Sequence, residues 1–467
     1  MMSSKKKRNK SNRNALYLFF LLSWIMIVTS CHVLHPYERP GGVAGQGLYR
    51  DTTITDSTTI AIIPWKLFFA DSSLQSLIQE GINNNYDLKI AVARIREAEA
   101  NYHQAYLAFF PSITGNADAT ISNNAQSNVS TTGTSKSLQT YLSSGWEIDL
   151  WGKLRSARRA QLAALLQSEA YRRSVQSQLV SNIAADYYNL LAYDQQLKIS
   201  LRTVENRKED IITTQALKDA DVLTGAAVMQ SNANRYSVEV TIPDIKRNIR
   251  ETENAICVLI GRNPGAIARD SLQNQQINAD LRTGLPTQLL SNRPDVQEAE
   301  YQVRYYAELT NVARTYFYPS INITGEAGLF QSGISQFFFT LAAGLTQPIF
   351  QNGLNKQRLE VAKGQEEEYL YTFERTVLSA GQEVSNALYE YQSANEKIDT
   401  RSKQLYYLQK SVEYTKELMK YNYNTNYTDV LTSEQNYLSA QLSSIDDKLQ
   451  QLQAIVSLYN SLGGGWR

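Results

Sequence analysis

The chain has 467 residues, with 46 lysines and arginines against 45 aspartates and glutamates, and only 3 histidines and 2 cysteines. The balanced charge argues against a general nucleic-acid binder, whose binding face is net basic. Because histidine and cysteine are scarce and we find no nucleophile–base pair or metal-ligand spacing, we expect neither an enzyme nor a bound metal or cofactor.

The N-terminus has the pattern of a bacterial lipoprotein signal. A basic run (Lys5–Arg13) precedes an apolar run (Ala15–Val28) that is too short for a comfortable membrane helix. Small residues then lead to Cys31, as in a lipobox, where the cysteine becomes the lipidated first residue of the mature chain. We expect residues 1–30 to be a signal peptide, and Cys31 to carry diacylglycerol and N-palmitoyl groups. The alternative is an ordinary signal with a chance cysteine.

The lipid-anchored segment, expected over residues 31–73, is followed by a chain without membrane helices. No later apolar stretch approaches the roughly 18 residues that a membrane helix needs. If the mature chain crosses a bilayer, it must therefore do so as a closed β-barrel, the other structure that satisfies its own backbone in lipid.

The rest of the chain is duplicated at an offset of 208 residues. Asp87 and Pro111 recur as Asp295 and Pro319, and the sequence DVLT recurs at residues 221–224 and 429–432. We expect two copies, residues 74–262 and 287–467, joined by a linker at 263–286. Each copy is predicted to contain a helix that ends before a proline (74–109 or 295–316), two strands, a very long helix, and a return helix of about 35–40 residues.

Four segments alternate between polar and apolar residues, near 113–122, 138–150, 321–329 and 337–346. This period over about ten residues is typical of transmembrane β-strands, although a half-buried soluble sheet gives the same pattern. Four strands cannot close a membrane barrel, since the smallest have about eight, so several chains must share one barrel. The loops at 122–137 and 332–335 are expected to face the outside of the cell.

Aromatic residues stand at the ends of these strands, where they fit the girdle at a membrane interface. They are Phe109, Phe110, Trp146, Trp151, Tyr316, Phe317, Tyr318 and Phe350.

Two proline-free runs follow the strand pairs, from 153 to about 217 and from 354 to about 421. As a helix, the first would extend about 100 Å. Its small apolar residues and many polar ones suit a wall with one wet side better than a dry bundle, the alternative being a solvent-exposed coiled coil.

Three segments carry a resemblance to a known family: LPTQLLSNRPDVQEAE (Leu285–Glu300), LIGRNPG (Leu259–Gly265) and LYNSLGGGW (Leu458–Trp466). They resemble the TolC superfamily, in its branch of outer-membrane efflux lipoproteins (the OprM/NodT type). The resemblance implies a mixed α/β membrane protein that forms a homotrimer. Its twelve-stranded barrel would lie in outer-membrane lipid and continue into a long periplasmic helical barrel.

The implied function is the passive exit duct of a tripartite efflux system for small molecules such as drugs. Its implied partners are a periplasmic adaptor (membrane fusion) protein and an inner-membrane transporter of the RND type. Two alternatives stay open: an outer-membrane channel for type I secretion, and a lipid-anchored coiled-coil structural protein.

The resemblance also implies a periplasmic constriction at the helical turns, ringed by charged and tyrosine side chains. Thr432 and Gln435 stand where relatives often have aspartate and arginine, which departs from the usual charged lock. Asp219, Asp221, Tyr423 and Asp429 are the nearby candidates for the constriction. The alternative is that these aspartates only cap helices.

Overall fold

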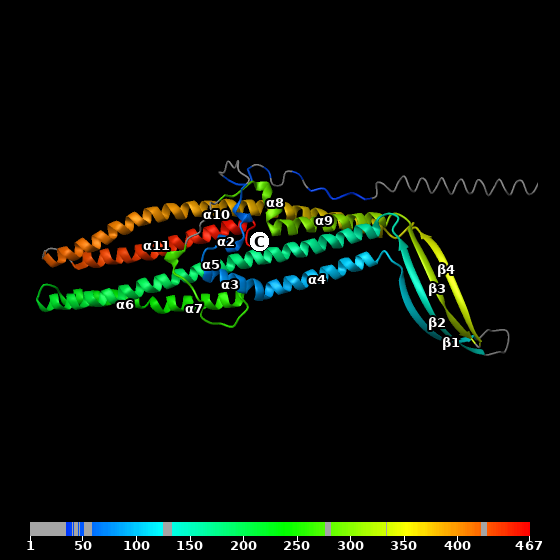
Figure 1. Ribbon diagram of the computed structural model, residues 1–467, viewed down its shortest axis with the longest axis horizontal. Coiled ribbons are helices and arrows are strands. Elements are labelled where there is room, and N and C mark those ends of the chain that lie inside the picture. Colours follow the sequence, from blue (N-terminus) through cyan, green and yellow to red (C-terminus); the bar gives the residue numbers. More distant parts are fainter. Residues whose placement is uncertain are drawn as a thin grey trace, which may run out of the picture. The chain divides into compact units, whose positions relative to one another are not determined.

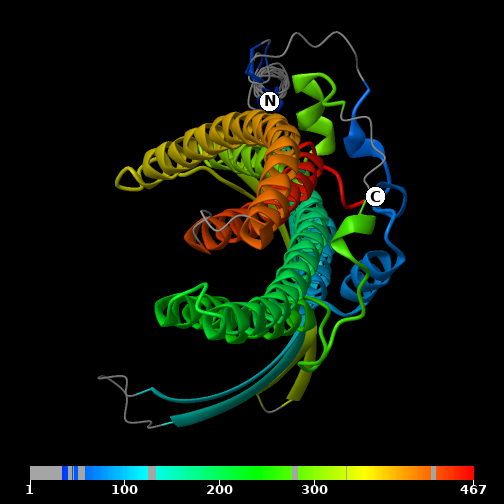
Figure 2. The same ribbon diagram turned by 90° about the vertical axis from the view of Figure 1, so that its left-hand side faces the viewer.

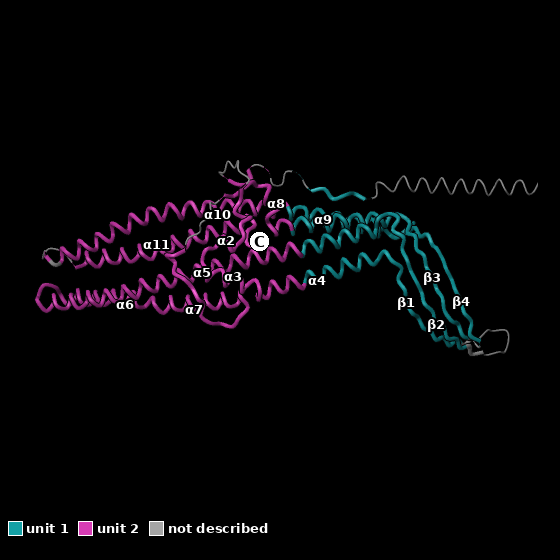
Figure 3. The backbone as a smooth tube through the Cα atoms, in the orientation of Figure 1, with its two compact units in different colours: residues 1–41, 94–168, 298–373 teal, residues 42–93, 169–297, 374–467 magenta. Residues whose placement is uncertain are grey.

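The computed structural model describes residues 34–39, 41, 45, 47–50, 58–124, 133–275, 282–332, 334–421 and 427–467. The predicted signal peptide, Cys31 and Tyr423 lie outside these residues. The chain forms two compact units (Figure 3). Unit 1 contains residues 1–41, 94–168 and 298–373, and unit 2 contains residues 42–93, 169–297 and 374–467. Each unit therefore draws on both copies of the duplicated sequence.

The strands all belong to unit 1 and form one antiparallel sheet in the order β1-β2-β3-β4. They are β1 (Ser112–Asn124), β2 (Gly133–Ile148), β3 (Ser320–Ser332) and β4 (Ile334–Thr346). The sheet is visibly curved in Figures 1 and 2. The strands are longer than the alternation predicts, because β1 and β2 extend into the segment 122–137 that was expected to be a loop.

One face of this sheet carries large apolar side chains that are exposed in the single chain. They include Ile113, Ile121, Leu138, Leu142, Leu329, Phe337, Phe339, Leu341 and Leu345. A soluble antiparallel sheet packs such a face against its core. The outward apolar face is instead typical of strands that meet lipid.

Two very long helices follow β2 and β4, as predicted. They are α5 (Lys153–Asp219), with 67 residues, and α10 (Leu354–Tyr421), with 68. The shorter helices α4 (Tyr86–Leu107) and α9 (Pro294–Thr315) precede β1 and β3. Both end before a proline, which cannot continue a helix interior. In the described part of the chain, none of the helices has the length and apolarity that a membrane span requires.

The return helices differ between the two copies. In the second copy, α11 (Tyr427–Ser461) is one continuous helix of 35 residues. In the first copy, the chain returns as α6 (Gly225–Glu239) and α7 (Ile242–Leu259), so the single predicted helix is wrong there. Pro243 explains the break, because it lacks the N–H that would bond to the carbonyl group of Glu239, yet it is tolerated in the first turn of α7.

The first predicted helix is likewise divided, into α3 (Ser72–Asn84) and α4. Asn85 stands between them. Its Oδ1 accepts a hydrogen bond from the backbone N–H of Leu88 (2.9 Å), and its Nδ2 donates to the carbonyl oxygen of Leu259 (2.9 Å). Asparagine is a favoured N-cap, so it starts a new helix here.

Unit 2 contains two helical hairpins, formed by α5 from residue 169 onward with α6 and α7, and by α10 from residue 374 onward with α11 (Figures 1 and 2). Short elements pack beside them: η2 (Ile60–Ile62), α2 (Trp65–Phe68), η3 (Leu272–Asn274), η4 (Pro286–Gln288) and α8 (Leu289–Asn292). The ring of Phe68 stacks on Tyr459 with centroids 3.9 Å apart, and Tyr459 Oη donates to the carbonyl oxygen of Ile63 (2.6 Å). Cys257 is fully buried, as expected for a small apolar side chain.

Candidate functional site: strand–helix junction and hairpin ends

The predicted interface aromatics lie where the strands of unit 1 meet its helices. Phe109 and Phe110 follow α4 after one intervening residue, and residues 316–318 directly follow α9. Phe110 is 56% exposed and Phe350 is 83% exposed, whereas Trp151 is buried. Their place at the strand ends agrees with the sequence pattern, and their contact with a membrane interface stays a prediction.

Two of these aromatics, Trp146 and Trp151, fasten neighbouring turns together. Trp146 Nε1 donates to the carbonyl oxygen of Phe109 (2.9 Å), and Trp151 Nε1 donates to that of Pro319 (2.7 Å). The Trp151 ring also lies 4.9 Å from the ring of Tyr318. An indole N–H needs a partner when it leaves water. The two tryptophans therefore tie the end of the β1–β2 hairpin to the helix–strand turns on either side of it.

Basic side chains cover the aromatic rings at this junction. Lys153 Nζ lies 5.4 Å and the Arg358 guanidinium 4.9 Å from the centre of the Tyr316 ring. Lys153 also forms an ion pair with Glu147 (3.0 Å). The start of both long helices is thus cationic and aromatic, a combination suited to the polar boundary of a bilayer.

A short segment that the sequence did not reveal, residues 34–39, packs against α9 within unit 1; we call it the strap. The backbone N–H of His35 donates to Asn311 Oδ1 (3.0 Å), and Asn311 Nδ2 donates to the carbonyl oxygen of His35 (2.8 Å). Arg39 forms a two-pronged ion pair with Glu300 (2.7 and 2.8 Å). Leu34 occupies the space beside Gly152, where an added Cβ would lie 2.5 Å from Leu34 Cδ1.

Two of the constriction candidates lie where α5 ends in unit 2: Asp219 is the last residue of α5, and Asp221 lies in the α5–α6 turn. Asp219 Oδ1 accepts a hydrogen bond from Gln215 Nε2 (2.8 Å). Asp221 has a positive φ of 58°, and its backbone N–H donates to the carbonyl oxygen of Lys218 (3.0 Å). Aspartate tolerates this left-handed conformation better than most residues, so Asp221 shapes the turn.

The other described candidates lie on the first turns of α11. Asp429 stands in the first turn, where the helix dipole favours a carboxylate. Thr432 Oγ1 donates to the carbonyl oxygen of Thr428 (2.8 Å). Gln435 Oε1 accepts a hydrogen bond from Arg207 Nη2 of α5 (3.2 Å). Gln435 therefore links two helices of one chain.

Beside Gln435 lies a charged group that sequence reasoning missed, the tip cluster of Asp210, Lys416 and Glu434. Lys416 Nζ lies 3.1 Å from Asp210 Oδ1 and 2.6 Å from Glu434 Oε1. The three come from α5, α10 and α11, so the cluster joins the two copies. Asp210 and Lys416 are 206 residues apart, and no motif marks them.

Two carboxylates share one ammonium group in the tip cluster, and this sets the pKa values there. Burial raises the pKa of Glu434, and the negative charge of Asp210 raises it further against the pull of Lys416. Burial alone would lower the pKa of Lys416, but its hydrogen bonds and charge interactions with Glu434 and Asp210 raise it. The charged form of Lys416 is therefore favoured, whereas the ionised form of Glu434 is disfavoured by its burial and by the charge of Asp210.

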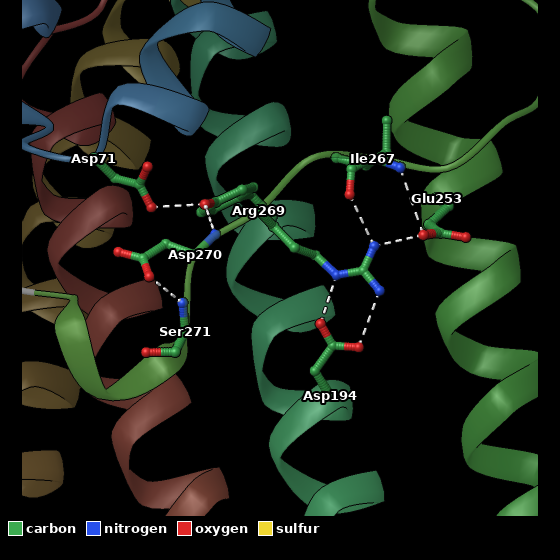
Figure 4. A network of polar contacts seen from close by, with 8 residues as sticks. Asp71, Asp194, Glu253, Ile267, Arg269, Asp270 and Ser271 are labelled. Carbon is green, nitrogen blue, oxygen red and sulfur yellow. Dashed lines mark hydrogen bonds and ion pairs between the residues drawn. The ribbon is translucent and has the colours of Figure 1, made fainter.

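Polar contacts hold the part of the predicted linker that the structure describes (Figure 4). Arg269 Nη2 donates to Asp194 Oδ1 of α5 (3.0 Å), and Arg269 also forms an ion pair with Glu253 of α7. Tyr187 Oη donates to Asp71 Oδ2 (2.6 Å) and accepts a hydrogen bond from the backbone N–H of Asp270 (3.0 Å). This irregular segment is held by charge and hydrogen bonds, which hydrophobic periodicity cannot show.

The arginine of the RPD segment is also structural. Arg293 is buried and pairs with Asp295 (2.6 Å) and with Glu383 of α10 (2.6 Å). Its Nη1 further donates to the carbonyl oxygen of Ser461 at the end of α11 (2.9 Å). α9 starts at Pro294 with Asp295 in its first turn, in agreement with the helix predicted from residue 295, but the sequence did not predict these contacts of Arg293.

Comparison with known proteins identifies the family. The family model for outer membrane efflux proteins matches residues 77–262 and 285–464, once in each copy. The cation efflux system protein CusC of Escherichia coli O6:H1 is 28% identical over 459 residues, which cover 95% of this chain and 97% of that protein. The probable efflux pump outer membrane protein TtgC of Pseudomonas putida is 29% identical over 457 residues, 94% of each chain.

Solved structures agree. The outer-membrane channel OprN matches with a TM-score of 0.84 at 25% identity, over 93% of this chain and 99% of that one. The open state of the MtrE outer membrane channel of Neisseria gonorrhoeae matches with a TM-score of 0.83 at 25% identity, over 93% and 98%. The chain therefore belongs to the outer membrane efflux protein family, and it is a non-enzymatic outer-membrane efflux channel with a TolC-like fold.

Proposed function

We propose that three copies of this chain form one exit duct, in which their strands close into a twelve-stranded barrel in the outer membrane. The observation that carries the proposal is the open sheet, whose outer strands β1 and β4 each lack a neighbour on one side within the described part of the chain. An open sheet edge is not tolerated in lipid, and four strands are too few to close. Identical neighbours supply the missing strands.

The duct is anchored by lipid on Cys31, a diacylglycerol and an N-palmitoyl group. A relative from Salmonella typhimurium, 26% identical over 461 residues, is named probable outer membrane lipoprotein SilC. The strap supports this proposal, because it begins three residues after Cys31 and docks beside Gly152 at the strand–helix junction.

The duct accepts small molecules passively from a periplasmic adaptor and an inner-membrane transporter of the RND type. The relatives are named for cation, toluene and antibiotic efflux, which favours small solutes over secreted proteins. Hairpin ends carrying Asp219, Asp221 and Asp429 form the periplasmic constriction, with Thr432 and Gln435 beside them.

The experiment is a measurement of mass and conductance on the same sample. The lipidated protein is purified in detergent, weighed by native mass spectrometry and added to a planar bilayer. We expect a trimer and discrete, long-lived conductance steps. A monomer that gives no steps would refute the duct and leave a lipid-anchored structural protein.

A further inference from the structure

The two outer strands of the sheet present matching surfaces. On β1, Ile113 is 73% and Ile121 is 72% exposed; on β4, Leu341 is 67% and Leu345 is 61% exposed. Unpaired edges with apolar side chains are templates for pairing with another chain. In the proposed trimer, on which this inference rests, the copies join through these two edges, and their register is the open question.

The duplication fixes which strand positions correspond. Ser112 of β1 and Ser320 of β3 are equivalent at the offset of 208 residues. Ser112 pairs with Gly145, and Ser320 pairs with Thr346. Gly145 of β2 therefore corresponds to Thr346 of β4, at an offset of 201 (346 minus 145).

An observation outside the sheet gives the same offset. Gly152 directly precedes α5 and Gly353 directly precedes α10, and both have a positive φ, of 81° and 80°. They too are 201 residues apart (353 minus 152). The correspondence between β2 and β4 thus extends through the turn into the long helices.

The contact between β2 and β3 joins the two copies of the repeat within one chain. We infer that it is repeated between chains, so that β4 pairs with β1 of the next protomer in the register that β2 keeps with β3. Leu142 pairs with Ala327 in the described sheet. Adding 201 to position 142 gives Ala343, and subtracting 208 from position 327 gives Ala119. The rule therefore places Ala343 opposite Ala119 of the neighbouring copy.

The same rule assigns the other pairs of these two strands. Ser144 with Gly325 becomes Leu345 with Ala117, and Thr140 with Leu329 becomes Leu341 with Ile121. Leu341 and Ile121 are both exposed in the single chain. The inferred register places their side chains next to each other on the same face.

The alternation of side chains agrees with this register. The exposed large apolar residues of β1 and, apart from Ile334 at its first position, of β4 all have odd numbers, and the inferred register pairs odd with odd. A slip of one residue would put the two apolar sets on opposite faces. A slip of two residues keeps the faces, so it is the competing register.

Cysteine cross-linking distinguishes these registers. Ala343→Cys with Ala119→Cys tests the inferred pair, and Ala343→Cys with Ala117→Cys tests the slip by two, both with Cys257→Ser to remove the buried thiol. Outer-membrane fractions are oxidised with copper phenanthroline and separated on a non-reducing gel. Directly opposite Cβ atoms are about 4.5–5.5 Å apart and diagonal ones are farther, so we expect the first pair to form covalent trimers about tenfold faster.

Each result has one reading when native mass spectrometry of the same variants is included. Faster linking of the Ala343→Cys and Ala117→Cys pair overturns the inferred register and leaves the trimer intact. A trimer that links through neither pair means that β4 and β1 do not meet, which overturns the inference alone. A monomer refutes the proposed function itself. Single-cysteine variants must stay unlinked for a positive result to count.

Discussion

Asp221 and Asp429 occupy the same position in the two DVLT segments, yet the backbone uses them differently. Asp221 has a left-handed conformation with φ 58°, whereas Asp429 lies in the first turn of α11. Alanine at position 221 would strain the turn as well as remove a charge. Asparagine enters the left-handed region readily, so it removes the charge and keeps the turn.

We predict that the double variant Asp221→Asn, Asp429→Asn lowers the cation preference of the channel by about twofold or more, because carboxylates near a constriction attract cations. The measurement is the reversal potential of single channels in a salt gradient. Asp244→Asn, on an exposed site in α7, is the control. An unchanged reversal potential in the double variant would remove both residues from the constriction.

Glu434 gives the tip cluster a pH dependence whose sign follows from its burial. The pKa of this carboxyl is raised in the folded chain, so the folded state binds its proton more readily than the unfolded state does. Its contribution to stability therefore grows as the pH falls from neutral through the folded pKa, and it is complete below the unfolded value of about 4.3.

Glu434→Gln should remove this trend, since glutamine does not titrate. We expect the difference in melting temperature between the wild type and this variant to shift in favour of the wild type as the pH is lowered from neutral to about 4, just below the unfolded pKa. Thermal unfolding followed by circular dichroism measures it. Glu205→Gln, on an exposed ion pair of α5, is the control, and an equal trend in both variants would contradict the assignment to Glu434.

At the scale of elements, one buried amide makes the hydrogen bonds that hold the backbone of the strap at His35. Asn311 is 1% exposed and makes both hydrogen bonds to the backbone of His35. Each such bond contributes about 1 kcal/mol, so their loss should raise the open fraction of the strap by roughly tenfold or more. Chymotrypsin cleaves after tyrosine, and Tyr37 lies in the middle of the strap.

We therefore predict that Asn311→Ala speeds chymotryptic cleavage after Tyr37 by about tenfold, detected as a chain that begins at Glu38 by intact mass. Asn101→Ala, at an exposed site on α4, is the matched control. Equal cleavage rates in the wild type and Asn311→Ala would mean that the two hydrogen bonds do not hold the strap.

The elements that the sequence predicts well are helices that run for a long stretch without proline, or that end just before a proline. The proline-free runs became α5 and α10, and α4 and α9 end before Pro111 and Pro319. The break between α6 and α7 at Pro243 was not predicted, although proline is the residue that causes it. The strap, the contact of Arg269 with Asp194 and the tip cluster were missed for one reason: each depends on polar contacts between distant segments, and these leave no local pattern.

At the scale of the molecule, the duplication determines more than the order of elements. The tip cluster joins α5 of the first copy to α10 and α11 of the second, and the β2–β3 pairing joins the copies in the sheet. In the proposed trimer, the β2–β3 contact within one chain is repeated between chains, so that each chain would supply two of six equivalent units of the barrel.

The orientation of the sheet can be tested with two neighbouring residues of β4. Leu341 lies on the apolar face, and Thr340 points to the other face because side chains alternate along a strand. If the apolar face meets lipid, an arginine at 341 costs about 2–4 kcal/mol near the middle of the bilayer, whereas an arginine that faces the channel stays hydrated.

We predict that Leu341→Arg loses most of the trimer from washed outer membranes, and that Thr340→Arg keeps the trimer and lowers its cation preference. Native gels and single-channel recordings measure the two effects. Equal loss in both variants, or loss in Thr340→Arg alone, would show that the apolar face does not meet lipid.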